Sequence, residues 1–306
     1  MHEIFSWIKG VVSPFEYGDP LASEGFWGPP TATLDFCEEN YVVSSYAAEI
    51  INTLTNLIYV FFAFNLLLST IRNKHGAIFI LASLGLLAVG VGSWLYHMTL
   101  RYEFQLLDEL PMVYFTWIPF AYVFTIGVEN RRTKLIIYGG MTTSLILFTV
   151  IYLFVYQNPA FHEIIYAGIS LGLVYRTIVL TNWYVTDRKF KRFMFKLLIF
   201  SMFEIALAFL VWNLDTIYCS GLIRARRFIG LPLGIFLELH GFWHLFIGIG
   251  IHHFILFTQC LNAWYKKQQA DYQIEWWLGL PFKVSLMKTK DKSHFGLQEK
   301  ADEARQ

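Results

Sequence analysis

Two histidines four residues apart are the sharpest chemical feature of the sequence. His240 and His244 lie within a long apolar stretch, and on an α-helix the side chains at positions i and i+4 leave the same face one turn apart. Two imidazoles placed in this way suit a single metal ion. Buried imidazoles need partners, so the apolar surroundings favour a metal site over two unrelated histidines.

A third histidine, His97, ends another apolar stretch. Three histidine ligands with one open position are the arrangement of a catalytic zinc site. The alternative for His97 is an interfacial histidine among aromatic residues. Ser93 lies one helical turn before His97 on the same face, and its alternative role is a hydroxyl bonded to the backbone of its own helix. The sequence leaves both alternatives open.

An acidic pair follows shortly after His97. The chain turns back there and returns Asp108 to a similar depth, where its carboxylate could act as general base for a water molecule at the metal. The alternative is a helix N-cap, because Pro111 follows within the first turn. Glu109 should point about a third of a turn away from Asp108. We therefore expect only one of the two carboxylates to serve the site.

A second candidate metal site lies near the N-terminus. Residues 35–40 hold three carboxylates and one amide, and Glu49 follows at the start of the first apolar stretch. Carboxylate, amide and carbonyl oxygens are ligands suited to Ca²⁺. The spacing and the glycine of an EF-hand loop are missing, and a solvated acidic loop is the alternative. Glu49 favours calcium because no basic residue lies near it in the sequence.

The composition is that of a membrane protein. Of the 306 residues, 56% are apolar and 15% are charged, against about 25% charged residues in typical soluble domains. The net charge of +1 gives no electrostatic reason to expect a nucleic-acid partner.

Apolar runs of about twenty residues are long enough to cross a bilayer core as helix. We predict an all-α membrane protein, a seven-helix transmembrane bundle with spans at residues 50–70, 77–98, 108–127, 135–156, 162–182, 194–213 and 229–258.

The basic residues predict the orientation of the bundle. Connections on one side are rich in Lys and Arg, and this side should be cytosolic. These connections hold Arg72, Lys74, Arg131, Arg132, Lys134, Arg188, Lys189, Lys191, Arg192, Lys266 and Lys267. The opposite connections are poorer in basic residues, although Arg224, Arg226 and Arg227 depart from the pattern. The N-terminus is therefore predicted to be luminal and the C-terminus cytosolic.

These predictions divide the chain into three parts. Residues 1–49 form a luminal segment with the candidate calcium loop, residues 50–260 form the transmembrane catalytic domain, and residues 261–306 form a cytosolic tail. The luminal segment lacks the basic start and apolar stretch of a cleavable signal peptide, and we expect it to be retained. Residues 287–306 are charged with little to bury and are expected to be disordered.

The remaining polar residues of the apolar segments are less informative. Arg176 and Glu204 could pair, snorkel or line a cavity, and the sequence does not choose. Glu238 should face away from the candidate metal ligands and support helix packing. His252 and His253 lie about 18 Å along the helix from the first of those ligands, too far to join them. We interpret these two as interfacial.

Two of the three cysteines fall on the predicted luminal side, where disulfides persist, and Cys260 falls on the cytosolic side. A bridge between Cys37 and Cys219 is therefore a candidate disulfide. The alternative is two unpaired thiols at distant sites.

Five ordered blocks of the sequence closely resemble the alkaline ceramidases, and the whole looks like their fungal members. The blocks are residues 26–29, 33–41, 92–100, 105–112 and 240–244. The resemblance covers residues 26–265. It implies a seven-helix membrane amidase that hydrolyses ceramide, as dihydro- or phytoceramide, to a sphingoid base and a fatty acid. Its architecture would be related to that of the adiponectin receptors, and it would lie in the membrane of the endoplasmic reticulum or the Golgi.

The resemblance also implies roles for individual residues. The family's zinc ligands map onto His97, His240 and His244. Its general base maps onto Asp108, and its serine near the metal, an oxyanion or water-positioning group, maps onto Ser93. Its paired luminal cysteines map onto Cys37 and Cys219. The ligands of a structural or regulatory Ca²⁺ map onto Asp35, Phe36 through its carbonyl, Glu38, Asn40 and Glu49. Phe36 stands where the family often has Trp, a change that a carbonyl ligand should survive.

Two other classes of protein compete with an amidase. A seven-helix lipid receptor would keep the histidines for a structural zinc, would hydrolyse only incidentally, and would not need Asp108. A transporter would show inverted repeats with broken helices, and the sequence has no such internal symmetry. The expected partners are ceramide and membrane lipids, with no obligatory protein partner.

Overall fold

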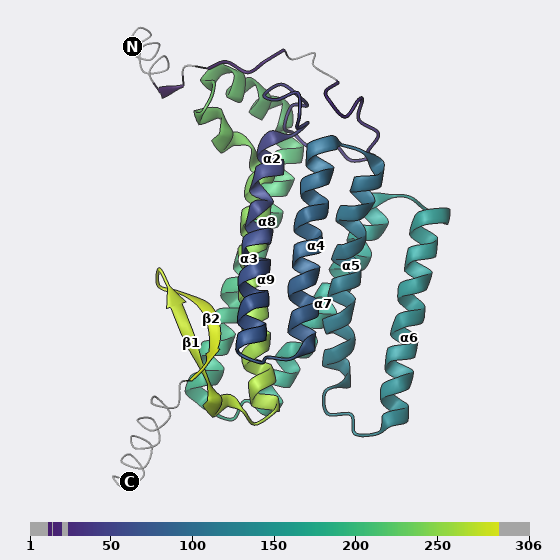
Figure 1. Cartoon of the computed structure of the whole chain (residues 1–306), viewed down its shortest axis with the longest axis vertical. Helices are drawn as coiled ribbons and strands as arrows, with labels where there is room; N and C mark the ends of the chain where they lie inside the picture. Colours follow the sequence, from purple (N-terminus) through teal and green to yellow (C-terminus); the bar gives the residue numbers. More distant parts are fainter. Residues whose placement is uncertain (1–11, 14, 20–23, 288–306) are drawn as a thin grey trace.

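The computed structural model describes residues 12–13, 15–19 and 24–287. Within this part the chain forms seven long helices arranged side by side, followed by a two-stranded hairpin (Figure 1). In chain order the helices are α2 (Ile50–Thr55), which continues as α3 (Leu57–Arg72), α4 (Ala77–Thr99), α5 (Tyr102–Thr125), α6 (Arg131–Val150), α7 (Pro159–Tyr184), α8 (Arg188–Ile229) and α9 (Leu239–Tyr265). The shorter elements are the π-helix η1 (Ile151–Val155), the 3-10 helices η2 (Leu233–Leu237) and η3 (Gln269–Asp271), and the strands β1 (Tyr272–Trp277) and β2 (Leu280–Leu286).

Six of the seven helices are long and apolar enough to cross a membrane. The seventh, α5, is of similar length but carries Glu103, Asp108 and Glu109 near its start. On α6 only 11% of the most apolar window is buried inside the protein, so most of its apolar side chains face outward, as suits lipid. The chain is a multi-pass membrane protein. The predicted all-helical architecture is confirmed, whereas the orientation stays a prediction.

The last predicted span began too early in the sequence. It was expected from residue 229, but α8 continues to Ile229 and α9 starts only at Leu239. Gly230, with a φ of 82°, ends α8, and Pro232 follows it. At 42 residues, α8 is about 63 Å long, roughly twice the thickness of a bilayer core. Its last turns therefore extend beyond the core.

The third predicted span began too late. It was expected from residue 108, but α5 begins at Tyr102 and its N-cap is Arg101. Asp108 consequently lies in the second turn of the helix. The structure therefore rules out the helix-cap alternative for Asp108.

The hairpin was not expected from the sequence, which predicted only a tail there. β1 and β2 pair in antiparallel fashion, and β2 packs on α3 and α9. His252 Nε2 lies 3.0 Å from Phe282 O. This histidine is therefore a buried partner of the hairpin and not an interfacial residue. Residues 288–306, within the segment predicted to be disordered, lie outside the described residues.

The other ionisable residues of the spans have local structural partners. His253 Nδ1 lies 2.8 Å from Glu204 Oε2 and joins α9 to α8; His253 is buried, contrary to the interfacial interpretation. Arg176 donates hydrogen bonds to Val123 O and Ile126 O at the end of α5, both at 3.3 Å. These contacts link neighbouring helices far from the three candidate zinc ligands.

Helices α4 and α5 approach closely at Gly92. A Cβ atom added to Gly92 would lie 2.1 Å from Leu107 O and 3.1 Å from Asp108 N. No side chain larger than hydrogen fits between backbones at that distance. The glycine therefore lets α4 and α5 come together next to Ser93 and Asp108.

We expect Gly92→Ala to lower the free energy of unfolding by about 1–3 kcal/mol, because the new methyl group must push the two helices apart. Thermal unfolding of the purified protein in detergent would measure the loss. Gly139→Ala on α6 is the control, since no atom lies within 4 Å of the added Cβ there. An unchanged unfolding midpoint in Gly92→Ala would contradict the close contact.

Candidate active site and metal centre

The three histidines predicted to be metal ligands meet at one end of the bundle, here called the histidine end. His97 comes from the last turns of α4, and His240 and His244 come from the first turns of α9. One ligand atom of each lies within 4.8 Å of the others, and all three residues are buried. In the described part of the chain, no other trio of His, Cys, Asp or Glu meets this distance. The three histidines could hold a metal ion such as zinc.

Polar partners orient two of the three imidazoles. His97 Nδ1 lies 2.5 Å from Glu49 Oε2, and His244 Nδ1 lies 2.9 Å from Thr55 Oγ1. A metal-binding histidine usually bonds through its second ring nitrogen to such a group. In both rings Nε2 is thereby left for a metal.

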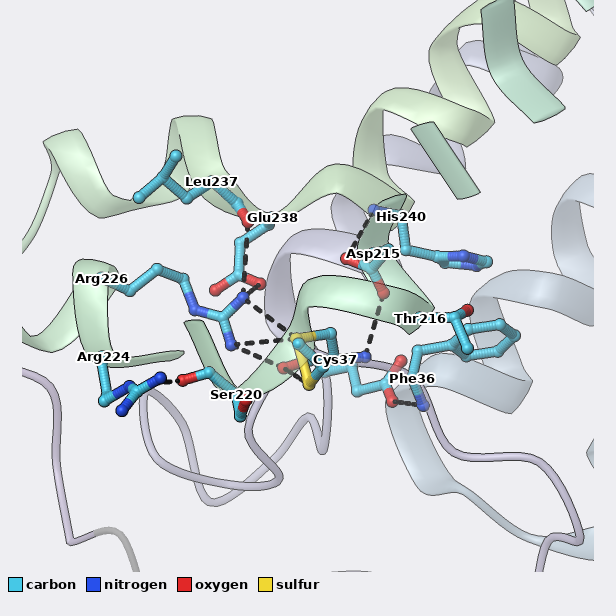
Figure 2. Close-up of a disulfide and its surroundings, with 12 residues drawn as sticks. Phe36, Cys37, Asp215, Thr216, Ser220, Arg224, Arg226, Leu237, Glu238 and His240 are labelled. Atoms are coloured by element: carbon cyan, nitrogen blue, oxygen red, sulfur yellow. Dashed lines mark hydrogen bonds and ion pairs between the residues drawn. A yellow bond between two sulfur atoms is a disulfide. The ribbon is translucent and has the colours of Figure 1, made fainter. Parts of the chain in front are cut away.

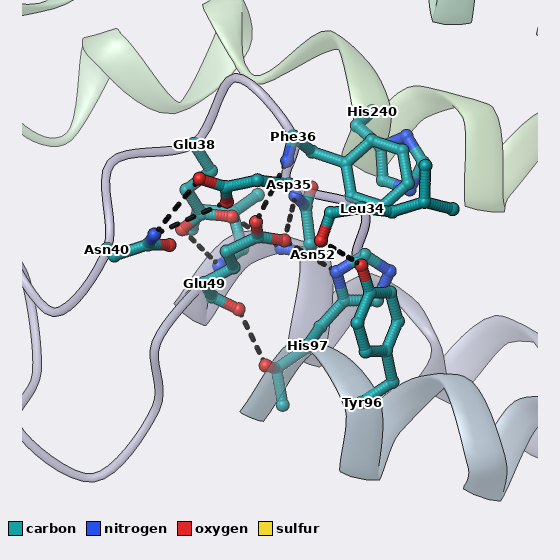
Figure 3. Close-up of polar contacts among 12 residues, drawn as sticks. Leu34, Asp35, Phe36, Glu38, Asn40, Glu49, Asn52, Tyr96, His97 and His240 are labelled. Atoms are coloured by element: carbon teal, nitrogen blue, oxygen red, sulfur yellow. Dashed lines mark hydrogen bonds and ion pairs between the residues drawn. The ribbon is translucent and has the colours of Figure 1, made fainter. Parts of the chain in front are cut away.

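His240 is held in a different way. Its ring stacks on Phe36, with the ring centroids 3.7 Å apart (Figure 3). Its Nδ1 is buried and has no hydrogen-bond partner among the described groups. An unpartnered buried nitrogen is costly, and coordination of a metal would satisfy it. The donor set therefore fits a zinc ion.

Asp108 and Ser93 meet across the contact between α5 and α4. The Ser93 hydroxyl faces the Asp108 carboxylate, and Ser93 lies one turn before His97. Glu109 turns away, as its position on the helix predicted. It accepts hydrogen bonds from Gln105 Nε2 at 3.0 Å and from the Tyr152 hydroxyl. Only one carboxylate of the acidic pair therefore faces the helix that carries His97.

The residues predicted to bind calcium lie around the start of α2 (Figure 3). Asn40 Nδ2 donates to Asp35 Oδ1 at 3.3 Å, and Phe36 N donates to Glu49 Oε1 at 3.4 Å. Glu38 accepts hydrogen bonds from the first two backbone N–H groups after residue 50, both at 2.8 Å. These residues are neighbours, but their carboxylates are not all within the 4.8 Å that the histidine nitrogens meet.

The electrostatics of this loop would favour a cation. Burial and the charge of Glu49 raise the pKa of Glu38 to about 8, and burial raises the pKa of Asp35 and Glu49. Carboxyl groups buried together resist ionising at the same time, and a divalent cation would offset that repulsion. Asn40 Oδ1 is also buried without a hydrogen-bond partner, so one more oxygen is available to such an ion.

Known proteins match the chain over most of its length. A family model described as ceramidase matches residues 28–284. The chain belongs to the ceramidase family. Alkaline ceramidase YPC1 of Saccharomyces cerevisiae is 38% identical over 275 residues, which cover 86% of this chain and 87% of that protein. Alkaline ceramidase 3 of Mus musculus is 39% identical over 248 residues, which cover 80% of this chain and 89% of that protein. The chain is thus a hydrolase of the ceramidase family.

A buried aspartate fixes the start of α9 in this ceramidase (Figure 2). Asp215 on α8 accepts hydrogen bonds from His240 N at 3.2 Å and from Cys37 N at 3.1 Å. A disulfide joins Cys37 to Cys219, whose Cα atoms are 5.2 Å apart. Asp215 therefore connects the loop of the calcium candidates directly to a candidate metal ligand.

A fully buried arginine lies beside the same disulfide (Figure 2). Arg226 Nη2 donates to Cys37 O at 2.5 Å, and Nη1 lies 2.8 Å from Glu238 Oε2. Glu238 therefore forms an ion pair away from the histidines. Arg227 pairs with Glu39 at 2.6 Å. Two of the three arginines that depart from the charge pattern are thus neutralised by carboxylates.

The roles of Asp215 and Arg226 and the contact between Glu49 and His97 were not predicted from the sequence. A signal for Asp215 was present, because it precedes Cys219 by four residues and must share its helix face. Neighbouring residues in the sequence gave no indication of the partners of Arg226 or of Glu49. These partners lie in other segments of the chain.

We expect Asp215→Asn to weaken metal binding roughly tenfold, a typical effect of losing a group that supports a metal ligand. The amide replaces one of the two acceptor oxygens with an N–H group, so one of the two backbone bonds is lost. Zinc retained by the purified protein against increasing chelator would measure the change. Thr216→Ala, an exposed neighbour on α8, is the control. Equal retention in Asp215→Asn and in the parent would show that Asp215 does not position His240.

Proposed function

We propose that this protein is a zinc-dependent membrane amidase that hydrolyses the amide bond of dihydro- or phytoceramide to a sphingoid base and a fatty acid. The observation that carries the proposal is the buried histidine trio beside the pair formed by Asp108 and Ser93. Membership of the ceramidase family supports the substrate class, and relatives named alkaline ceramidases support the reaction.

The residues present divide the work of amide hydrolysis. A zinc ion bound by the histidines would polarise the amide carbonyl and lower the pKa of water. Asp108 accepts a proton from the water as its oxygen bonds to the carbonyl carbon, and it then gives this proton to the amide nitrogen, which leaves as the free amine when the C–N bond breaks. Ser93 orients that carboxylate, and its hydroxyl can position water or stabilise the developing oxyanion. Glu49 and Thr55 hold two of the histidine rings.

The surroundings of the site suit a substrate with long chains. A groove of about 460 Å³ lies where α2, α3, η2 and α9 meet, and its lining is almost entirely apolar. Thr55 is part of that lining and also contacts His244. An acyl chain in this groove would bring an amide close to the histidines, which favours a lipid amide over a soluble one.

In the proposed enzyme a calcium ion has a structural or regulatory role. The loop of Asp35, Phe36, Glu38, Asn40 and Glu49 supplies hard oxygen ligands. Glu49 also touches His97, so a calcium ion here would order one side of the zinc site without taking part in the reaction.

The proposed enzyme lies in the membrane of the endoplasmic reticulum or the Golgi. With the N-terminus luminal, the histidine end faces the lumen of the endoplasmic reticulum or the Golgi. The disulfide between Cys37 and Cys219 supports this orientation, because disulfides persist in that compartment. The protein would work alone on ceramide within the bilayer, with membrane lipids as its other partners.

We expect Asp108→Asn to keep its zinc and lose activity by about 10²-fold or more, because it removes the general base and leaves the metal ligands intact. Release of fatty acid from an acyl-labelled dihydroceramide in detergent micelles would measure activity, and elemental analysis would measure zinc. Glu103→Gln, an exposed acid on the same helix, is the control. His240→Ala should lose both zinc and activity.

The same experiment separates the amidase from a lipid receptor. Full activity in Asp108→Asn would remove Asp108 from the mechanism. If the parent binds zinc and ceramide but releases no fatty acid, the receptor class would be favoured and the histidines would be structural.

We expect Asn40→Ala to require more calcium for full activity while its zinc content stays that of the parent, because Asn40 lies in the calcium loop and away from the histidines. Activity titrated with calcium after chelation would test this. Glu39→Gln is the matched control, since Glu39 bonds to Arg227. Identical titrations for Asn40→Ala and the parent would argue against calcium at this loop.

A further inference from the structure

The hairpin that follows α9 ends in an exposed apolar tip. The exposed fractions are 57% for Trp276 and Trp277, 82% for Leu278 and 42% for Leu280. Four large apolar side chains at one turn are unusual for a surface in water. Within the described part of the chain, nothing covers this tip.

The backbone of the turn is also unusual for a hairpin exposed to water. Leu278 has a φ of 51° and Gly279 a φ of 79°, and positive φ at both central residues defines a type I′ turn. Such turns favour Asn or Asp before Gly, whereas a leucine in the left-handed region is strained. In water both the strain and the exposed leucine would be unfavourable. An apolar environment around the tip would offset them.

Polar contacts hold the base of the hairpin firmly to the bundle. His75 Nε2 lies 2.8 Å from Val284 O, and Leu286 N donates to Asn73 Oδ1 at 2.9 Å. The ring of Tyr272 stacks on His75, with centroids 5.0 Å apart. Asn73 and His75 lie in the connection between α3 and α4. The base is therefore fixed at the end of the bundle opposite the histidine end.

From this base the hairpin points back along the bundle (Figure 1). The six residues of β1 extend about 20 Å, and the end of the strand lies beside the first turns of α8. The Trp276 ring lies 6.0 Å from that of Phe193 on α8. The first turns of α8 are strongly basic, with Arg188, Lys189, Lys191, Arg192 and Lys196. The tip thus lies next to a cationic helix start and continues the outward apolar surface of the bundle.

We propose that the tip of this hairpin inserts into the adjacent leaflet of the bilayer at the level where headgroups meet acyl chains. Tryptophan favours this zone, where its ring is apolar and its N–H can reach water. The outer edge of β1 needs partners for its backbone groups, which excludes the deep hydrocarbon. The neighbouring lysines and arginines suit anionic headgroups at the same depth. The hairpin is thus a shallow membrane anchor attached to α9.

A site-specific label tests the proposal on the full-length protein. In the described part Cys37 and Cys219 form a disulfide and Cys260 is buried, so Leu278→Cys supplies an accessible thiol for an environment-sensitive fluorophore. The protein would be reconstituted into phosphatidylcholine and phosphatidylserine liposomes containing a nitroxide-labelled phosphatidylcholine. Gln268→Cys, exposed in the connection before the hairpin, is the control.

The label at Leu278→Cys should show blue-shifted emission and be quenched more by a nitroxide near the carbonyl end of the acyl chain than by one near its methyl end. The label at Gln268→Cys should be quenched by aqueous iodide instead. If Leu278→Cys does not fold, Leu280→Cys on the same tip carries the same test. Iodide quenching of the tip label, or emission that shifts with protein density but not with lipid nitroxide, would overturn the proposal in favour of water or a protein neighbour.

Discussion

The structure of the histidine end depends on the need of three buried imidazoles for polar partners. A buried polar atom without a partner is costly, and rings from two helices converge only if both helices are held in register. Glu49 and Thr55, at the two ends of α2, each bond to one ring. Helix α2 thus packs against both α4 and α9 and connects the two helices that carry the histidines. A metal at the trio would satisfy the nitrogens that remain.

The non-helical segment before α2 is held in place by the same need for partners. Its backbone and side chains are bonded at Cys37 by Asp215 and Arg226, and Glu38 caps the start of α2. Irregular backbone is tolerated at the edge of a membrane where protein groups satisfy it. Arg226 is buried with Glu238 and therefore adds little free positive charge.

Local spacing predicted much of the site, and contacts between distant residues account for what it missed. The helical repeat placed His240 and His244 on one face and separated Asp108 from Glu109. The start of α9 was wrong because apolar residues continue across Gly230 and Pro232, so hydropathy alone shows no boundary there. The hairpin was missed because a leucine occupies the turn position that usually identifies one. Asp215 was missed because its two partners lie in other parts of the chain.

The contrast between Asp108 and Glu109 favours a catalytic site over a purely structural metal site. Glu109 is satisfied by Gln105 and Tyr152, as expected of an acid that supports packing. The Asp108 carboxylate faces the Ser93 hydroxyl, and no cation pairs with it among the described residues. A partly buried carboxylate with so little support is unfavourable inside a membrane bundle, and a structural zinc held by three histidines would not require it. A general base beside a metal needs a carboxylate that is oriented by one hydroxyl and otherwise free to accept a proton. The proposed function therefore assigns the base to Asp108 and not to Glu109, one residue along the same helix.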